Sequence, residues 1–280
     1  MLKDNFPTHI FLDFDGTITN LAGEISAPAV EMLTKLAGKC LRVIATGRTV
    51  SSFCSRVKAD FPIDYLIFST GAGIMDWQQK KIINYHSFDA AQTKQITELL
   101  QDLKFSFSRH HPIPDNHKFE YFQGEHDVED FRRYLQLHAK DKILESSEIA
   151  NSTQFLIITD DKDYPLGNFA ELHEFANIFK ISSPIDHQTT WIEILPKNVS
   201  KSRAAQHLLT ILDQQPRFTV AVGNDYNDTD LIVWADQGFI VSTADSDLLA
   251  NYPILENAQN DGVARLLRNI IYQLPASYRE

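Results

Sequence analysis

The stretch His9-Ile10-Phe11-Leu12-Asp13-Phe14-Asp15-Gly16-Thr17 decides how the rest of the chain is interpreted. Its first four residues form a short apolar run that ends abruptly in acid, which predicts a buried strand with Asp13 at its carboxyl end. Asp15 follows two residues later. Like charges this close resist joint ionisation unless a cation or a lysine lies beside them, and Mg²⁺ suits such oxygen ligands. Taken alone, an Asp-x-Asp pair at a strand end is more often a turn or a helix cap.

Strands and helices then alternate as they do in a parallel α/β sheet. A helix is predicted to start at Ser26-Ala27-Pro28, where Ser26 is a favourable N-cap. The apolar runs Leu41–Ala45 and Tyr65–Ser69 predict two further buried strands, and a helix over roughly Val50–Lys58 lies between them. Strand, helix, strand, helix, strand predicts a Rossmann-like, parallel-sheet core.

The pattern changes at about residue 84. The region that follows mixes amphipathic helices with strand-like pieces: Ala90–Leu103, Val128–Lys140 and Gly167–Ala176 as helices, and Phe105–Ser108, Phe119–Phe122 and Gln154–Thr159 as strands. This mixture predicts a separate α+β unit inserted into the first domain. We therefore predict an α/β core over residues 1–83 and 189–280, and an inserted unit over residues 84–188.

The parallel pattern is predicted to resume after the inserted unit. The remaining predicted elements are strands at Trp191–Leu195, Phe218–Val222 and Phe239–Val241, and helices at Ser200–Leu212, Asp228–Ala235 and Gly262–Leu274, the last capped by Asp261. Ligands in open α/β sheets bind beyond the carboxyl ends of the strands. The groups predicted to converge there are Asp13 and Asp15, Thr46-Gly47-Arg48, Gly71-Ala72-Gly73, Asn224-Asp225, and Lys201 at a helix start.

These residue types suit phosphoryl transfer. A carboxylate held against a phosphoryl group by a metal can attack it and form an aspartyl-phosphate, and a second carboxylate can protonate the leaving oxygen. A metal, a lysine and backbone N–H groups spread the developing charge. Each piece alone has a plainer explanation, since Lys201 can be solvated and Gly71 and Gly73 can mark a hairpin. The joint order of the pieces at strand ends favours the chemistry.

With these motifs in place, the chain resembles the haloacid dehalogenase superfamily of phosphatases. Within it, the chain is similar to the Cof-type branch, class IIB, whose relatives include sucrose-phosphate and mannosyl-phosphoglycerate phosphatases. The segments that carry the resemblance are Asp13-Phe14-Asp15-Gly16-Thr17, Ala45-Thr46-Gly47-Arg48, Lys201, Gly223-Asn224-Asp225-Tyr226-Asn227-Asp228 and Asn260-Asp261-Gly262-Val263-Ala264. The inserted unit falls where this class carries its cap domain, of type C2B.

The resemblance implies a role for each matched residue. It makes Asp13 the nucleophile and Asp15 the general acid/base, which binds metal through its carbonyl group. The implied phosphate-binding residues are Thr46, Gly47, Lys201 and Asn227, and the implied Mg²⁺ ligands are Asp13, Asp15, Asn224 and Asp228. Arg48 follows the second motif and is the candidate substrate contact, with a surface role at the helix start as the alternative. The family usually has aspartate where this chain has Asn224. One formal charge is therefore lost, and Asp225 next door is the alternative ligand.

Composition limits the partners. The 280 residues carry a formal net charge of -11, which repels nucleic-acid phosphates and anionic lipid, so we expect neither nucleic acid nor a membrane as a partner. Cys40 and Cys54 show no metal-type spacing and fit a reducing, cytoplasmic location. No signal peptide or membrane span is visible. We expect a monomer or a small homo-oligomer.

The expected function is a Mg²⁺-dependent phosphomonoesterase that acts on a small phosphorylated metabolite, a sugar phosphate, through an aspartyl-phosphate. A phosphohexomutase is one alternative. A phosphate-responsive receiver is a second, against which Asp15 and the inserted unit count, and a degenerate sugar-phosphate sensor is a third, suggested by Asn224. Substrate choice is assigned to the cap. There the polar segment Arg109-His110-His111 is predicted to be a solvated loop, with a substrate contact as the alternative.

Overall fold

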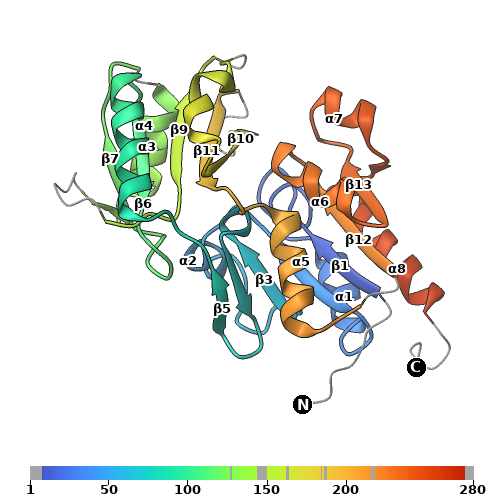
Figure 1. The fold of residues 1–280 in the computed structure, drawn as a ribbon. Helices are drawn as coiled ribbons and strands as arrows, with labels where there is room; N and C mark the ends of the chain where they lie inside the picture. Colours follow the sequence, from blue (N-terminus) through green and yellow to red (C-terminus); the bar gives the residue numbers. More distant parts are fainter. Residues whose placement is uncertain are drawn as a thin grey trace. The chain divides into compact units, whose positions relative to one another are not determined.

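The computed structural model describes residues 8–126, 128–143, 150–161, 164–183, 185, 188–215 and 218–274. Residues 1–7, where the sequence predicts no signal peptide, lie outside the described part. The chain forms two compact units (Figure 1). The first unit comprises residues 1–48, 53–84 and 200–280, and the second comprises residues 49–52 and 85–199. The second unit is thus inserted into the chain path of the first.

The first unit is built on an eight-stranded sheet of order β14-β13-β12-β1-β2-β3-β4-β5. Its strands are β1 (Thr8–Leu12), β2 (Leu41–Ala45), β3 (Tyr65–Phe68), β4 (Gly73–Asp76), β5 (Lys81–Tyr85), β12 (Phe218–Gly223), β13 (Gln237–Val241) and β14 (Ile254–Leu255). The strands from β14 to β3 run parallel. Strands β1 and β2 are buried along their whole length, which explains their uninterrupted apolar runs. The prediction of an α/β parallel-sheet core is confirmed.

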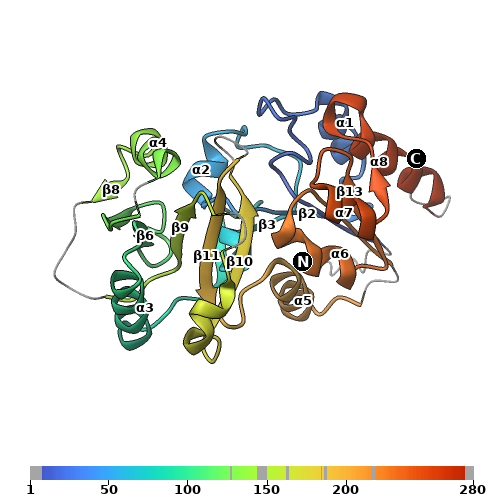
Figure 2. The same ribbon diagram turned by 90° about the horizontal axis from the view of Figure 1, so that it is seen from above.

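Helices cover both faces of this sheet. They are α1 (Ala27–Lys35), α5 (Lys201–Leu212), α6 (Thr229–Trp234), α7 (Ser246–Asn251) and α8 (Gly262–Gln273). Helix α2 (Val50–Cys54) is divided between the units, since residues 49–52 belong to the second. Residues of α5 and α6 pack against Phe11 and Val43 on one face, and Figure 2 shows α1 and α8 on the other. Helix α2 is shorter than predicted. Asp261 does not cap α8 with its side chain, because its backbone is left-handed and it makes no capping hydrogen bond.

The second unit has a six-stranded sheet of order β10-β11-β9-β6-β7-β8. Its elements are α3 (Ala90–Asp102), β6 (Phe107–His110), β7 (Phe119–Phe122), α4 (Glu129–Leu137), β8 (Lys142–Ile143), β9 (Phe155–Thr159), the 3₁₀ segment η2 (Leu166–Leu172), β10 (Ala176–Ser182) and β11 (Thr190–Pro196). Helix α3 begins with a capping box between Asp89 and Gln92. Its apolar side packs on the face that contains Phe155 and Ile157, whereas α4 packs on the face that contains Leu156.

The predicted boundary at residues 188 and 189 is wrong. The run Trp191–Leu195 does not open the return of the parallel sheet, because β11 lies antiparallel between β10 and β9 in the second sheet. The first unit therefore resumes at Ser200. The helix predicted over Gly167–Ala176 is also wrong: η2 ends at Leu172, and strand β10 begins at Ala176.

The predicted solvated loop at residues 109–111 is largely a buried strand. Arg109 and His110 belong to β6, and the Arg109 guanidinium forms an ion pair with Glu120 on β7. Both partners are buried. His110 is held by the carbonyl oxygen of Asn116 at 2.9 Å from Nδ1 and by the Tyr134 hydroxyl at 3.2 Å from Nε2. Both side chains are thus engaged inside the second unit.

Two buried histidines should make both units sensitive to acid. Burial lowers the pKa of His9, in β1, and of His110, in β6, from 6.5 to about 4. The unfolded chain takes up these protons first as the pH falls below 6.5, so stability falls between pH 6.5 and about 4. Each histidine contributes up to about 3 kcal/mol to this loss. Urea unfolding at pH 7.0, 6.0, 5.0 and 4.5 measures it.

The variants His9→Gln and His110→Gln should each flatten this pH dependence, since glutamine does not titrate. The matched control is His173→Gln, because His173 is exposed. It should leave the pH dependence of unfolding as it is in the parent chain. An equal slope in all four proteins would contradict the assignment.

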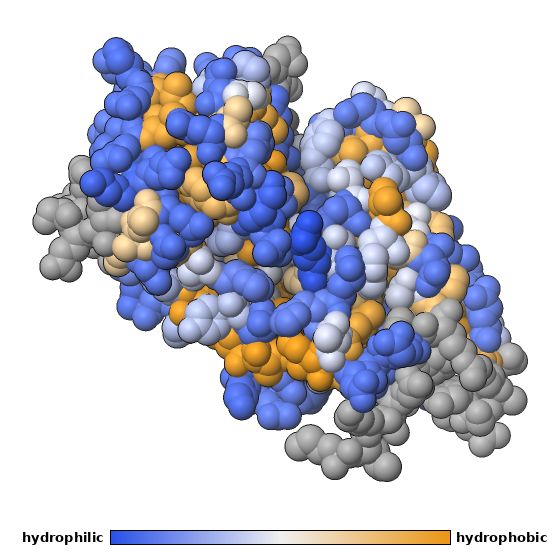
Figure 3. Space-filling model, in the orientation of Figure 1, coloured by the Kyte–Doolittle hydropathy of each residue, from blue (hydrophilic) through white to orange (hydrophobic). Residues whose placement is uncertain are grey.

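The face seen in Figure 3 is mostly hydrophilic. Figure 3 shows blue residues over most of the visible face of each unit, with smaller orange patches between them. Large exposed hydrophobic side chains are scattered along the described chain: Leu21, Tyr85, Leu137, Ile211, Val233, Ile254 and Tyr272. Within the described ranges, no helix combines the length and the apolar character needed to cross a membrane.

Candidate active site

Three charged side chains meet beneath the carboxyl edge of the first sheet. Asp13 directly follows β1, Lys201 is the first residue of α5, and Asp228 ends the 3₁₀ turn η3 (Tyr226–Asp228) after β12. The Lys201 ammonium lies 2.7 Å from Oδ1 of Asp13 and 2.5 Å from Oδ1 of Asp228. Residues that lie 188 positions apart in the sequence thus share one hydrogen bond. The sequence predicts that Asp13, Lys201 and Asp228 converge, and these hydrogen bonds show that they do.

All three members of this cluster are almost completely buried. Asp13 is 4% exposed, Lys201 1% and Asp228 0%. Burial raises the pKa of Asp13, and Lys201 opposes that rise. Burial lowers the pKa of Lys201, but the charges of Asp13 and Asp228 outweigh it, so its pKa lies above the ordinary value. A buried carboxylate held against a buried ammonium is the environment expected of a functional group.

Asn224 brings a side-chain amide against the loop that carries Asp13 and Asp15. One of its two terminal amide atoms lies 3.0 Å from the carbonyl oxygen of Asp15 and 3.1 Å from Oδ2 of Asp13. Gly16 makes room for it: a Cβ there would lie 2.6 Å from the Asn224 amide, and the φ of Gly16 is +74°. Only glycine adopts that backbone easily and leaves the space free.

This donor set fits a magnesium ion. A magnesium–oxygen bond of about 2.1 Å with octahedral geometry places neighbouring ligand oxygens about 3.0 Å apart. The spacings of the Asn224 amide from Asp15 O and Asp13 Oδ2 match that value. Among the described residues, no cluster of three or more His, Cys, Asp or Glu side chains could hold a metal. The oxygens offered at this position are those of one carboxylate, one backbone carbonyl and one amide.

Asp228 hydrogen-bonds both Lys201 and the backbone of the loop that carries Asn224. One of its carboxylate oxygens accepts from Lys201, and the other accepts from the backbone N–H groups of Asn224 at 2.9 Å and Asp225 at 3.1 Å. The Asp225 carboxylate bonds the backbone N–H of Tyr226 at 2.7 Å. Asn224, and not Asp225, therefore lies beside Asp13. Asn227 is buried in the same turn, and its predicted phosphate contact stays a prediction.

Arg48 pairs with Asp15. Its Nε and Nη2 atoms each lie 2.7 Å from a different oxygen of the Asp15 carboxylate. Thr46, which is 1% exposed, directly follows β2, and its hydroxyl accepts from the Arg48 backbone N–H at 3.2 Å. Gly47 lies between them. The predicted contact of Arg48 with substrate stays a prediction, and its direct contact with the Asp15 carboxylate is the new finding.

Gly71 and Gly73, which follow β3, lie in a hairpin, as the simpler explanation of these glycines predicts. The 3₁₀ turn η1 (Ser69–Gly71) leads from β3 into β4, which runs antiparallel to it. Ser69 and Thr70 are buried with φ values of 49° and 54°, an unusual backbone for a β-branched residue. The Thr70 N–H donates to the Thr46 carbonyl at 3.0 Å. Strained backbone of this kind gathers at functional sites.

Sequence reasoning missed Asp230. Its Oδ2 accepts from the backbone N–H of Ser202 at 3.1 Å and from the Ser202 hydroxyl at 2.5 Å. The bond ties the first turn of α5, next to Lys201, to the first turn of α6. An aspartate at a helix start is common, so nothing in the sequence singles it out.

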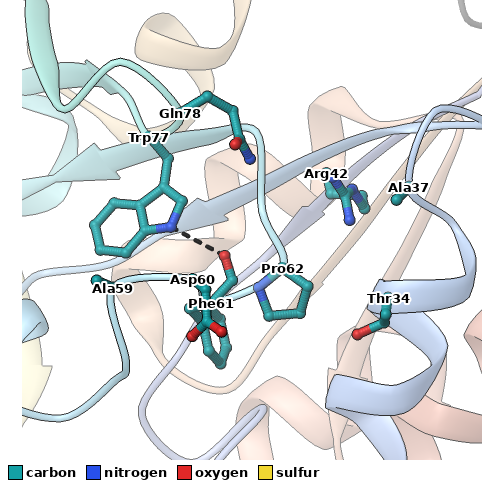
Figure 4. A pocket seen from close by; sticks show the side chains of 9 residues that line it. All are labelled: Thr34, Ala37, Arg42, Ala59, Asp60, Phe61, Pro62, Trp77 and Gln78. Atoms are coloured by element: carbon teal, nitrogen blue, oxygen red, sulfur yellow. Dashed lines mark hydrogen bonds between the residues drawn. The ribbon is translucent and has the colours of Figure 1, made fainter.

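A pocket of about 250 Å³ lies elsewhere in the first unit (Figure 4). Its lining residues are Thr34, Ala37, Arg42, Ala59, Asp60, Phe61, Pro62, Trp77 and Gln78. Arg42 stands near the start of β2, so this pocket is at the edge of the sheet opposite to Thr46. The Arg42 guanidinium already bonds both Asp64 oxygens and the Leu33 carbonyl. The charge of Arg42 is therefore already neutralised by Asp64.

The chain is similar to known proteins over nearly its whole length. Residues 10–267 match the family of haloacid dehalogenase-like hydrolases. A Haemophilus influenzae protein named "Putative phosphatase" is 24% identical over 274 residues, which are 91% of this chain and 94% of that protein. Among solved structures, the phosphatase BT1666 of Bacteroides thetaiotaomicron superposes with a TM-score of 0.76 at 15% identity, covering 95% of this chain and 96% of that one. The subclass IIB sugar phosphatase BT4131 gives 0.72 at 15%, covering 94% and 98%.

Proposed function

Because the chain belongs to the haloacid dehalogenase-like hydrolase family and is a phosphatase of that family, we propose that it is a Mg²⁺-dependent phosphomonoesterase. Its substrate is a small phosphorylated metabolite, a sugar phosphate, and its reaction passes through an aspartyl-phosphate. The observation that carries the proposal is the buried cluster in which Lys201 bonds both Asp13 and Asp228.

Asp13 is the nucleophile in this proposal. Lys201 holds Oδ1 of Asp13 at 2.7 Å, which fixes the direction of the carboxylate and leaves Oδ2 on the side of Asn224. The ammonium also supplies positive charge where negative charge develops on a transferring phosphoryl group. Thr46, Gly47 and Asn227 are the proposed phosphate contacts, through a hydroxyl, a backbone N–H and an amide.

Asp15 is the proposed general acid/base. Two bonds from Arg48 engage both of its carboxylate oxygens. An oxygen must be free to carry a proton to the leaving group and later to take one from water. Each oxygen keeps a second lone pair that can carry this proton. An anionic phosphate near Arg48 would compete for the guanidinium and free the Asp15 carboxylate further.

Magnesium would be held by Oδ2 of Asp13, the carbonyl oxygen of Asp15 and the amide oxygen of Asn224, with Asp228 positioning the Asn224 loop from behind. When bound, the ion supplies charge that neutralises the phosphoryl oxygens and orients them. The chain's own groups then attack, donate and accept protons.

The second unit is the proposed cap, with the corrected range 85–199. The sugar phosphate is proposed because BT4131, which shares the fold, is a sugar phosphatase. We propose a cytoplasmic location and a monomer or small homo-oligomer. The free thiols of Cys40 and Cys54 are compatible with a reducing compartment.

The function is tested with a panel of phosphorylated metabolites and an aryl phosphate, with Mg²⁺ and with a chelator. We expect release of inorganic phosphate, a fall of at least about 100-fold in rate with chelator, and recovery when Mg²⁺ is restored. Analysis of the sugar products separates hydrolysis from movement of the phosphate to another carbon. No phosphate release from any ester under either condition would contradict the proposal.

A further inference from the structure

Asn224 stands where the resemblance leads one to expect an aspartate, and the structure shows what an amide can do there. Its terminal atom beside Asp13 and Asp15 is placed between two oxygen atoms that cannot donate a hydrogen bond when Asp13 is ionised. The two ends of an amide have opposite chemistry, since one donates and the other accepts. The same position in space can therefore serve two different purposes.

With nitrogen at that position, the amide joins the two loops. Asn224 Nδ2 then donates to the carbonyl oxygen of Asp15 at 3.0 Å and to Oδ2 of Asp13 at 3.1 Å. Both contacts have the length of ordinary hydrogen bonds. These two hydrogen bonds give each oxygen a donor and offset the repulsion between the oxygens. A bound cation would have the same effect.

With oxygen at that position, the amide completes a set of three oxygens. The same distances of 3.0 and 3.1 Å then become the spacing of neighbouring ligands around magnesium. The exchange needs only a half turn about one side-chain bond. The surroundings confine the amide without fixing its ends, because Gly16 has no side chain to exclude either atom and the Asn224 backbone N–H is held independently by Asp228.

We propose that Asn224 is an amide switch for the metal site. Its nitrogen end holds Asp13 and Asp15 together in the absence of magnesium, and its oxygen end binds the ion after a half turn. This inference rests on the proposed metal dependence. An aspartate could serve only the second state, because a carboxylate facing Asp13 Oδ2 and a carbonyl oxygen would repel both. The chain therefore keeps an ordered site without the ion and binds the ion less tightly.

Asn224→Asp should separate the two ends of the switch. We expect the magnesium Kd to fall by at least about 10-fold, because the ion gains a charged ligand and no longer has to displace two hydrogen bonds. We expect the melting temperature in chelator to fall by about 4 °C or more, because a third carboxylate joins Asp13 and Asp228. Titration calorimetry and thermal unfolding, both without substrate, measure the two effects.

Asn224→Ala removes both ends. It should also lower the melting temperature in chelator, but it should weaken magnesium binding by at least about 10-fold. Asn168→Asp is the matched control, since it adds the same charge at an exposed residue of the second unit. It should change neither the melting temperature in chelator nor the magnesium Kd by a comparable amount.

The outcomes decide between the alternatives. An unchanged melting temperature in chelator for both Asn224 variants would overturn the nitrogen end, and unchanged or weaker magnesium binding by Asn224→Asp would overturn the oxygen end. In the parent chain, the ¹⁵N side-chain resonance of Asn224, identified by its loss in Asn224→Ala, should shift on addition of magnesium. A resonance that stays in place would overturn the switch. None of these measurements requires turnover, so they test the amide switch even if the activity screen fails.

Discussion

Asp13→Asn should abolish turnover while the protein stays folded. The change removes the attacking carboxylate oxygen and keeps the size of the side chain, so we expect a loss of at least about 10³-fold in kcat for an aryl phosphate. The fold should tolerate the change, because burial already disfavours the charge on Asp13 and Lys201 keeps its bond to Asp228. Steady-state kinetics and urea unfolding of the same preparation measure both quantities.

Asp102→Asn is the matched control, because Asp102 is an exposed carboxylate in the second unit, and its kcat should equal that of the parent. Acid quenching during turnover should yield parent protein that carries one extra phosphoryl group, and Asp13→Asn should yield none. Turnover that survives in Asp13→Asn at near the parent rate would show that another group is the nucleophile.

Lys201→Met should be both inactive and unstable. Methionine fits the space of the lysine stem but leaves Asp13 and Asp228 as buried carboxylates without a countercharge. Removing one partner of a buried ion pair lowers the free energy of unfolding by about 3–5 kcal/mol. We also expect a loss of at least about 100-fold in kcat, since the ammonium stabilises transferring charge. Urea unfolding followed by fluorescence reports on both units, because Trp77 and Trp234 lie in the first and Trp191 lies in the second.

Three comparisons sharpen this prediction. Lys58→Met removes an exposed lysine from the same unit and should change little. Adding Asp228→Asn to Lys201→Met should restore part of the lost stability, because one buried carboxylate disappears. The loss should also be smaller at pH 5 than at pH 8, because burial raises the pKa of Asp13 and protonation removes its unpaired charge. A Lys201→Met protein as stable as the parent at pH 8 would refute the buried cluster.

Much of the first sheet could be predicted because its central strands are buried on both faces. Such strands read as continuous apolar runs, and the polar residues that follow them mark the carboxyl edge. The same kind of apolar run led to the wrong domain boundary before Trp191–Leu195. A strand buried on both faces looks alike in a parallel and an antiparallel sheet, so only pairing with β9 and β10 assigns β11 to the second unit.

The meeting of Asp13, Lys201 and Asp228 was predictable from the sequence, but the other contacts around them were not. The order of Asp13, Thr46, Lys201 and Asp228 along the chain indicates one site, since each follows a strand or starts a helix. The bonds of Arg48 to Asp15, of Asp228 to the Asn224 backbone and of Asp230 to Ser202 depend on side-chain directions in three dimensions. Charge and spacing along the sequence do not encode those directions.

The interrupted path of the first unit has a consequence for synthesis of the protein. Residues 85–199 leave the ribosome as one uninterrupted piece, so nearly all of the second unit can fold while translation continues. The first unit has β1 in the middle of its sheet, and β1 lacks its neighbour β12 until residue 223 has been made. Asp13 is therefore synthesised long before its partners Lys201 and Asp228. The nucleophile acquires its neighbours only after the inserted unit has emerged.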